Sequence, residues 1–223
     1  SAFIISLLVK LVYPLVWIST RLTRLFNQHK GNDITREEVI ALASLAHKEG
    51  GLFPQENAYI SNSLGLRSIK VDKILTPRTV VHMLDASLTV EQALAQSRTH
   101  QFSRIPIYTN NHDNVTSKVF LIDMLEAAYK GRKNDTLSSL SKPIIRVSEK
   151  LSVQKLIDLF IKQKTHLFLV EDEFGQMAGI VTLEDAIETL LGREIVDERD
   201  TVEDMQALAK KKFRERLRDQ KAQ

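Results

Sequence analysis

The chain has 223 residues, a formal net charge of +3 and no cysteine, so disulfides and thiol-ligated metals are excluded. Hydrophobic residues make up 43% and charged residues 26% of the chain, which is ordinary for a globular protein. A chain of this length can bury a sizeable core in one or two domains.

Residues 1–30 are more apolar than the rest of the chain. The apolar run at residues 3–18 is too short and too interrupted to predict a membrane span, which needs about 20 apolar residues. We interpret residues 7–26 as an amphipathic helix at a membrane surface, with Tyr13 and Trp17 at the interface. The basic residues would then face the cytoplasm: Arg21, Arg24 and Lys30. The alternative is an ordinary helix that packs on the globular core or on a partner chain.

Residues 31–68 predict two consecutive helices. The first begins after Thr35 or Asp33, either of which can cap it, and ends at the Gly50–Gly51 pair. The second runs from about residue 54 to residue 64. No catalytic constellation falls in this segment, so we interpret it as a mechanical connector.

One unit of the sequence is present twice. Residues 88–94 align with residues 151–157 at an offset of 63 positions, and after a small indel residue 123 falls on residue 185 at an offset of 62. Each copy predicts an extended segment, a helix, a strand, a turn, a strand and a helix. Each copy also offers an N-cap for its first helix: Thr89 and Ser152. Two tandem copies predict a pseudo-twofold domain and not a long solenoid.

The second copy contains a strand-to-helix junction that suits an anionic ligand. In residues 179–185, Thr182 and Asp185 fall where an apolar strand turns into a helix. A helix start offers free N–H groups and the positive end of the helix dipole, which suit a phosphate. Thr182 adds a hydroxyl donor, and Asp185 is an acceptor suited to a ribose diol. The alternative is a helix cap, with Thr182 as N-cap and Asp185 at N3. The duplication favours the ligand site.

Several motifs follow one another in order: residues 75–81, 103–108, 170–175, 179–185, Gly192 and 194–198. Together they resemble the CorC/HlyC/cyclin M family of membrane proteins associated with magnesium and cobalt efflux, and the resemblance covers roughly residues 34–200. The repeated unit resembles a cystathionine-β-synthase (CBS) domain. The resemblance implies an α+β fold of tandem CBS domains, with two βαββα repeats forming a pseudo-twofold Bateman module, preceded by an N-terminal helical connector.

This organisation divides the chain into a membrane-proximal amphipathic helix (1–30), a helical connector (31–68), CBS domain 1 (69–133), CBS domain 2 (134–198) and a charged C-terminal helical tail (199–223). The basic tail lacks interleaved aromatics and a reading motif, so no nucleic acid is expected. We interpret it as a solvated helix, with attraction to an anionic membrane surface as the alternative. Many relatives carry a further small domain after the CBS pair, which here was either cut away or is lacking.

In such pairs, the resemblance implies that the early segment of one copy meets the Thr-x-x-Asp of the other, which gives two clefts. The predicted nucleotide-binding residues of cleft one are Thr76, Pro77, Ser103, Arg104, Ile105, Pro106, Thr182, Glu184 and Asp185. Arg104 offers a planar fork of donors to phosphate oxygens, although pairing with a surface Asp or Glu is an alternative. Ile105 and Ile180 would flank a flat adenine, and Glu184 or a neighbouring carboxylate would hold a magnesium ion.

Cleft two would combine the Lys142–Pro143 segment and Leu167 with Phe120 and Asp123. Here Phe120 replaces the threonine of cleft one, Ser117 replaces the glycine and Leu167 replaces the arginine. The hydroxyl, the guanidinium and the close-approach glycine are therefore all missing. We expect cleft two to be empty or filled by side chains.

Enzyme signatures are absent. No Gly-x-Ser-x-Gly, P-loop or His-Glu-x-x-His motif occurs, and the six histidines show no metal-ligand spacing, so neither catalysis nor a resident metal is expected. His166 aligns with Ser103 near the ligand region, and we interpret it as a core histidine. The acidic run at residues 194–200 is interpreted as a solvated loop, with binding of a divalent ion as the alternative.

The resemblance implies the regulatory region of a membrane divalent-cation transporter or efflux protein, at the cytoplasmic face of the inner or plasma membrane. The expected ligand is an adenine nucleotide, ATP or else ADP or AMP, with Mg²⁺. The expected partners are a second copy, paired through the CBS domains, and the protein's own membrane domain, absent from this chain. Because the sequence begins at Ser1, we expect a fragment. The alternative function is a ligand-free dimerisation scaffold, and an enzyme is the least supported.

Overall fold

The computed structural model describes residues 12–14, 16–19, 21 and 34–193. The described residues up to 21 are helical, whereas the rest of the helix predicted at residues 7–26 lies outside the described residues. The predicted tail (199–223) and the acidic run (194–200) also lie outside them. None of the helices in the described part of the chain combines the length and the apolar composition needed to cross a membrane.

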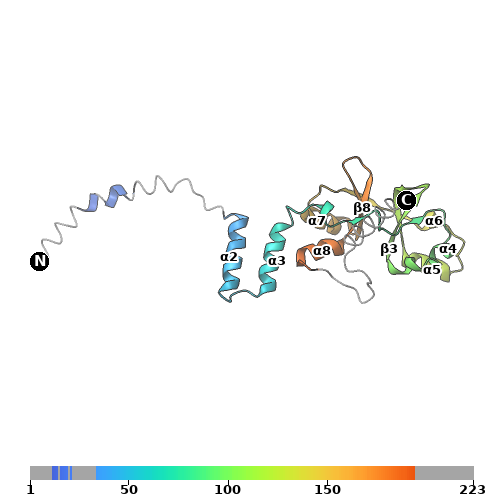
Figure 1. Cartoon of the computed structure of the whole chain (residues 1–223), viewed down its shortest axis with the longest axis horizontal. Coiled ribbons are helices and arrows are strands. Elements are labelled where there is room, and N and C mark those ends of the chain that lie inside the picture. Colours follow the sequence, from blue (N-terminus) through green and yellow to red (C-terminus); the bar gives the residue numbers. More distant parts are fainter. Residues whose placement is uncertain (1–11, 15, 20, 22–33, 194–223) are drawn as a thin grey trace, which may run out of the picture.

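The connector folds as a hairpin of two helices, α2 (Arg36–Lys48) and α3 (Pro54–Gly65) (Figure 1). Thr35 caps α2, because its Oγ1 accepts a hydrogen bond from the backbone N–H of Glu38 at 3.2 Å. In return the Glu38 carboxylate accepts from the N–H of Thr35 at 3.2 Å. This reciprocal capping box confirms the predicted start of the helix. After α2 the chain turns at Gly50, whose φ of 80° suits glycine.

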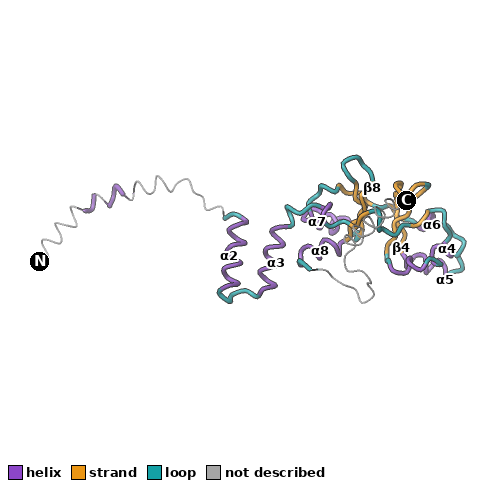
Figure 2. Tube along the Cα trace, viewed as in Figure 1, coloured by secondary structure: helices purple, strands orange, loops and turns teal. Residues whose placement is uncertain are grey.

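The two sequence repeats fold into two four-stranded sheets with helices beside them (Figure 2). The first repeat contributes β2 (Leu84–Asp85), α4 (Val90–Leu94), β3 (Arg104–Thr109), β4 (Asn111–Phe120) and α5 (Leu121–Tyr129). The second contributes β6 (Ile145–Ser148), α7 (Val153–Gln163), β7 (Leu167–Glu171), β8 (Met177–Thr182) and α8 (Leu183–Leu191). Both repeats have the order βαββα, which confirms the predicted α+β fold. Shorter elements join them: η1 (Val71–Lys73), η2 (Ser97–Gln101) and α6 (Leu137–Leu140).

Each repeat sends a two-residue strand to the edge of the other repeat's sheet. β1 (Thr76–Pro77) pairs antiparallel with β8, so that Thr76 faces Ile180 and Pro77 faces Gly179. β5 (Lys142–Pro143) pairs in the same way with β4. Proline is tolerated in both strands because each lies at a sheet edge, where an N–H can be spared. This exchange brings the early segment of one repeat to the Thr-x-x-Asp of the other, as the resemblance implied.

Helix caps and buried apolar side chains stabilise the two repeats. Thr89 caps α4 and Ser152 caps α7, as predicted from the sequence. The core of the second repeat includes Phe160 and Phe168, whose ring centroids are 4.4 Å apart. Leu75, which directly precedes β1, is buried in this same core. The segment before β1 therefore packs with the second repeat, although it precedes the first along the chain.

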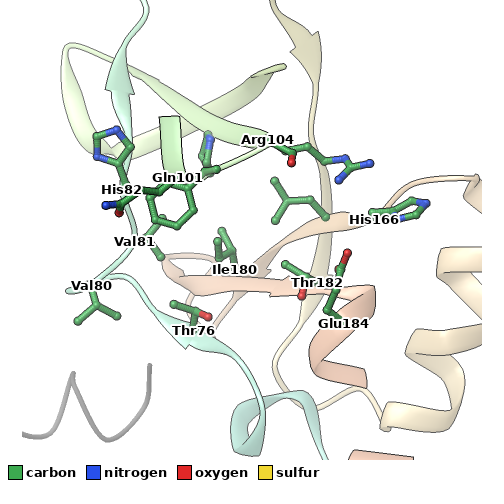
Figure 3. A pocket seen from close by; sticks show the side chains of 14 residues that line it. Thr76, Val80, Val81, His82, Gln101, Arg104, His166, Ile180, Thr182 and Glu184 are labelled. Carbon is green, nitrogen blue, oxygen red and sulfur yellow. The ribbon is translucent and has the colours of Figure 1, made fainter. Parts of the chain in front are cut away.

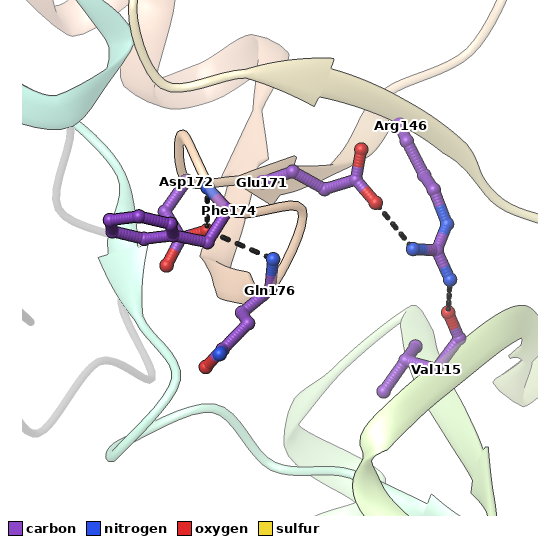
Figure 4. Close-up of polar contacts among 6 residues, drawn as sticks. All are labelled: Val115, Arg146, Glu171, Asp172, Phe174 and Gln176. Carbon is purple, nitrogen blue, oxygen red and sulfur yellow. Dashed lines mark hydrogen bonds and ion pairs between the residues drawn. The ribbon is translucent and has the colours of Figure 1, made fainter.

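A third cluster of buried side chains and one arginine link the two sheets. The cluster consists of Val115, Ile144, Leu167, Leu169 and Met177. At its edge, Arg146 Nη1 contacts Glu171 Oε1 at 2.5 Å, while Arg146 Nη2 donates to the Val115 carbonyl of the other sheet at 2.7 Å (Figure 4). In the adjacent hairpin, Asp172 Oδ1 accepts from the N–H groups of Phe174 and Gln176. The two repeats are therefore packed as one unit.

The connector rests on the last helix of the second repeat. Gly192, the C-cap of α8, has a φ of 68°. A Cβ at this position would lie 2.4 Å from Asn62 Nδ2 of α3, so the two helices approach closely at this point. Figure 1 shows the second repeat between the connector and the first repeat. The end of α8 is therefore in direct contact with the connector.

Candidate functional site

A cavity of about 330 Å³ lies between the two sheets (Figure 3). Its walls come from β1 and the loop after it, from the end of η2 and β3, and from the junctions at the start of β7 and the start of α8. The lining residues are Thr76, Val80, Val81, His82, Gln101, Phe102, Ser103, Arg104, Pro106, His166, Leu167, Ile180, Thr182 and Glu184. Both repeats therefore contribute to one site.

One end of this cavity is mainly apolar. Val81, Phe102 and Ile180 line it, and the His82 ring stacks on the Phe102 ring at a centroid distance of 5.6 Å. Burial, and secondly the charge of Arg98, lower the pKa of His82. The imidazole is therefore neutral at physiological pH, because a lowered pKa favours the uncharged form. Such a wall suits a flat aromatic base.

The opposite end is polar, and Figure 3 shows Arg104, His166 and Glu184 grouped there. Arg104 begins β3, and its guanidinium carbon lies 5.7 Å from the centroid of the Phe120 ring on β4. Among the described residues, no carboxylate forms an ion pair with Arg104. The guanidinium is thus held by a ring face and not neutralised by an acid. This arrangement suits the binding of an anion.

Thr182 and Asp185 form a reciprocal cap at the start of α8. Asp185 Oδ2 accepts from the Thr182 N–H at 2.6 Å and from the Thr182 hydroxyl at 2.7 Å. In return Thr182 Oγ1 accepts from the Asp185 N–H at 3.2 Å. The cap interpretation is therefore confirmed. The Thr182 hydroxyl proton points to Asp185, and it is the threonine, not the aspartate, that lines the cavity.

The structure brings six of the nine predicted site residues to the cavity wall: Thr76, Ser103, Arg104, Pro106, Thr182 and Glu184. Ile105 is a correction, because it is fully buried in the core of the first repeat and cannot flank a ligand. Neighbouring residues of a strand point to opposite faces. Because Arg104 and Pro106 point into the cavity, Ile105 points away from it. Pro77 and Asp185 lie beside the cavity without lining it.

Two further placements differ from the predictions. Leu167, assigned to cleft two, lines this cavity, because it faces Thr182 across the β7–β8 pair. His166 is exposed and lines the cavity, so it is not a core histidine. Sequence reasoning missed Val80, Val81, His82, Gln101 and Phe102. The sequence feature that could have revealed them is that they lie near the predicted residues 76 and 103 along the chain.

At the position of cleft two, Lys142 contacts both Phe120 and Asp123, and a cavity of about 290 Å³ lies beside Asp123 and Lys142. The Lys142 ammonium lies 4.7 Å from the centroid of the Phe120 ring and forms an ion pair with Asp123 at 3.0 Å. The aspartate that corresponds to Asp185 is thus neutralised by a lysine from β5. The absence of a ligand from cleft two stays a prediction.

Among the described residues, no group of three or more acidic or histidine side chains could hold a metal ion. Glu184 is the one carboxylate on the cavity wall. Because Mg²⁺ is often held by one or two carboxylates together with substrate phosphates, this site fits an ion that arrives with a nucleotide.

Comparison with known proteins identifies the class. The CBS domain family model matches residues 137–192, within the second repeat. A solved structure described as the CBS domain of the bacterial CNNM/CorC family Mg²⁺ transporter is 34% identical, with a TM-score of 0.67 over 74% of this chain and 99% of that one. A structure of such a domain in complex with ATP is also 34% identical, with a TM-score of 0.59 over 63% of this chain and 99% of that one. The protein is therefore a CBS-domain protein.

Full-length relatives narrow the assignment further. The UPF0053 protein sll1254 of Synechocystis sp. is 34% identical over 200 residues, which cover 89% of this chain and 58% of that protein. A putative DUF21 domain-containing protein of Arabidopsis thaliana, At3g13070, is 33% identical over 78% of this chain and 26% of its own length. The chain belongs to the CNNM/CorC family. It spans little more than half the length of the Synechocystis relative.

Proposed function

We propose that the chain is the regulatory region of a membrane divalent-cation transporter or efflux protein, and that it binds one adenine nucleotide, as Mg-ATP, on the cytoplasmic side. The observation that carries the proposal is the cavity between the sheets, which has an apolar wall at one end and Arg104 at the other. Its volume of about 330 Å³ falls in the range of ligand pockets, roughly 300–1,000 Å³. The related domain described in complex with ATP supports the choice of nucleotide.

The lining residues divide into three roles. Adenine would lie against Ile180 and Phe102 at the apolar end. The ribose would lie near Thr182, whose hydroxyl oxygen and backbone are held in place by Asp185. The phosphates would meet Arg104, and Glu184 at the same end of the cavity would share a magnesium ion with them.

The signal would pass to the membrane domain through helices in contact. Thr182 and Glu184, at the start of α8, line the cavity, while the far end of α8 contacts α3 at Asn62. A ligand that draws α8 toward β3 therefore moves the connector. It shifts the equilibrium only if it binds one arrangement of the two subunits more tightly than the other.

A thermal-shift panel tests the proposal. ATP, ADP, AMP and cyclic dinucleotides are each added with and without Mg²⁺. A ligand present at 100 times its dissociation constant stabilises the protein by about 2.7 kcal/mol, so at least one adenine nucleotide should raise the melting temperature by several degrees. If no nucleotide at millimolar concentration changes the melting temperature, the proposal is wrong.

The second candidate function, a dimerisation scaffold without a ligand, is favoured by one surface. Ile122, Leu125 and Tyr129 recur along α5 at helical spacing, and they are 66%, 41% and 93% exposed. We propose that this stripe pairs with the stripe of a second copy. Such pairing is also compatible with the regulatory function. Both candidate functions need the dimer, and they differ only in whether a ligand binds.

Replacing Ile122 and Tyr129 with serine should turn the dimer into a monomer at micromolar concentration. The expected change in dimer affinity is at least tenfold, because two exposed apolar anchors are removed. Light scattering after size-exclusion chromatography measures the mass. The matched control is Phe174→Ser, which removes a 78% exposed ring from the β7–β8 hairpin and should leave the mass unchanged. A dimer that survives the double change would place the interface elsewhere.

A further inference from the structure

Lys118 is buried, and the packing around it does not explain why a lysine occupies this position. It lies on β4 with 6% of its surface exposed, and its ammonium donates a hydrogen bond to Thr165 Oγ1 at 2.9 Å. Within residues 34–193, no carboxylate forms an ion pair with it. An ammonium can donate three hydrogen bonds, and its burial without an opposite charge is unfavourable.

The surroundings of Lys118 increase this cost. Desolvation lowers the pKa of Lys118, and the positive charge of Arg104 lowers it further. Both cations approach the same Phe120 ring, with the Arg104 carbon 5.7 Å and the Lys118 nitrogen 6.0 Å from its centroid. The Lys142 ammonium lies 4.7 Å from the same centroid and pairs with Asp123, so three cations lie near this ring. An anion at the Arg104 end of the cavity would offset this repulsion.

Lys118 adjoins the polar end of the cavity. Across the β3–β4 pair it faces Pro106, which lines the cavity. Its hydrogen-bond partner Thr165 directly precedes His166, another lining residue. Lys118 itself does not line the cavity in this structure, so its flexible stem must turn for the ammonium to contact a ligand.

We propose that Lys118 and Arg104 form a two-cation site for a polyphosphate, in which Lys118 contacts the terminal phosphate and so selects nucleotides with more than one phosphate. The inference rests on the proposed nucleotide function and adds a residue that determines specificity. Arg104 supplies a planar fork for the phosphates nearer the ribose, and Lys118 supplies a mobile point charge beyond it. In the second repeat the corresponding residue is Ile180, so the lysine is a feature of the first repeat alone.

Calorimetric titration of Lys118→Met tests this role. Methionine keeps the length and apolar stem but removes the charge. The variant should bind ATP at least tenfold more weakly than the wild type, which corresponds to about 1.4 kcal/mol, while AMP and adenosine keep their affinities within about twofold. The control is Lys150→Met, which makes the same change in net charge at an exposed position outside the cavity wall and should leave all three affinities unchanged.

The other possible results also distinguish the inference from the proposed function. If ATP, AMP and adenosine are weakened equally, Lys118 has a structural role and the inference is overturned, while the proposed function stands. If the wild type binds none of the three, the proposed function itself fails. If the variant does not fold, the wild-type protein still tests the inference. Equal affinities for ATP and AMP without Mg²⁺ would contradict a polyphosphate site.

Discussion

Replacing Gly179 with alanine should lower the free energy of unfolding by about 3 kcal/mol and abolish nucleotide binding. Gly179 on β8 faces β1, and a Cβ there would lie 2.1 Å from the Thr76 carbonyl oxygen and 2.9 Å from Leu75 Cδ1. Because the nearest atom belongs to the backbone, β1 must move away from the sheet. Thr76 and Ile180, which form one wall of the cavity, would then separate.

The first repeat supplies the matched control for this substitution. Ser117 stands at the corresponding position of β4 and already carries a Cβ beside Pro143 of β5. Ser117→Ala should therefore change the free energy of unfolding by less than about 1 kcal/mol. Urea denaturation gives the stabilities, and calorimetry with ATP gives the binding. A Gly179→Ala protein with wild-type stability and affinity would show that the β1–β8 approach is not close in solution.

Removing Thr182 and Asp185 together, as Thr182→Ala with Asp185→Ala, should weaken nucleotide binding about 100-fold, or about 3 kcal/mol. The Thr182 side chain lines the cavity, and Asp185 fixes it by accepting from its hydroxyl at 2.7 Å and from its N–H at 2.6 Å. Without these bonds the start of α8 loses the geometry that we propose for the ribose and the first phosphate. Calorimetric titration with ATP measures the loss.

The same double change also removes a helix cap, which by itself costs about 1–2 kcal/mol of stability. Another capping box lies at the start of α4, where Thr89 and Gln92 exchange hydrogen bonds of 3.0 and 3.2 Å. Thr89→Ala with Gln92→Ala removes that cap without touching the cavity wall. The two double variants should have similar stability, yet only the first should lose nucleotide affinity. If the two double variants bind nucleotide with equal affinity, the Thr-x-x-Asp motif acts only as a helix cap.

Much of this fold could be predicted from the sequence, because its signals are local. The caps at Thr35, Thr89 and Ser152 follow from single residues and their spacing, and the structure confirms all three. The duplicated pattern predicted two βαββα units for the same reason. The exchange of edge strands came from the family resemblance, since pairing between distant segments leaves no local pattern.

The composition of the cavity wall was harder to predict. Ile105 was misplaced because the face of a strand to which a residue points depends on the register of β3, which the sequence alone did not fix. Phe102 and His82 were missed because they come from irregular segments whose position is set by tertiary packing. Lys118 drew no notice, since a lysine in an alternating strand is normally expected on the surface.

The crystal structure of the protein grown with excess ATP and Mg²⁺ tests the central claim most directly. We predict one ATP per chain in the cavity between the sheets, with adenine against Ile180 and phosphates at Arg104, and no nucleotide at Phe120. A vacant cavity at saturating ATP, or nucleotide bound at Phe120 instead, would contradict the account.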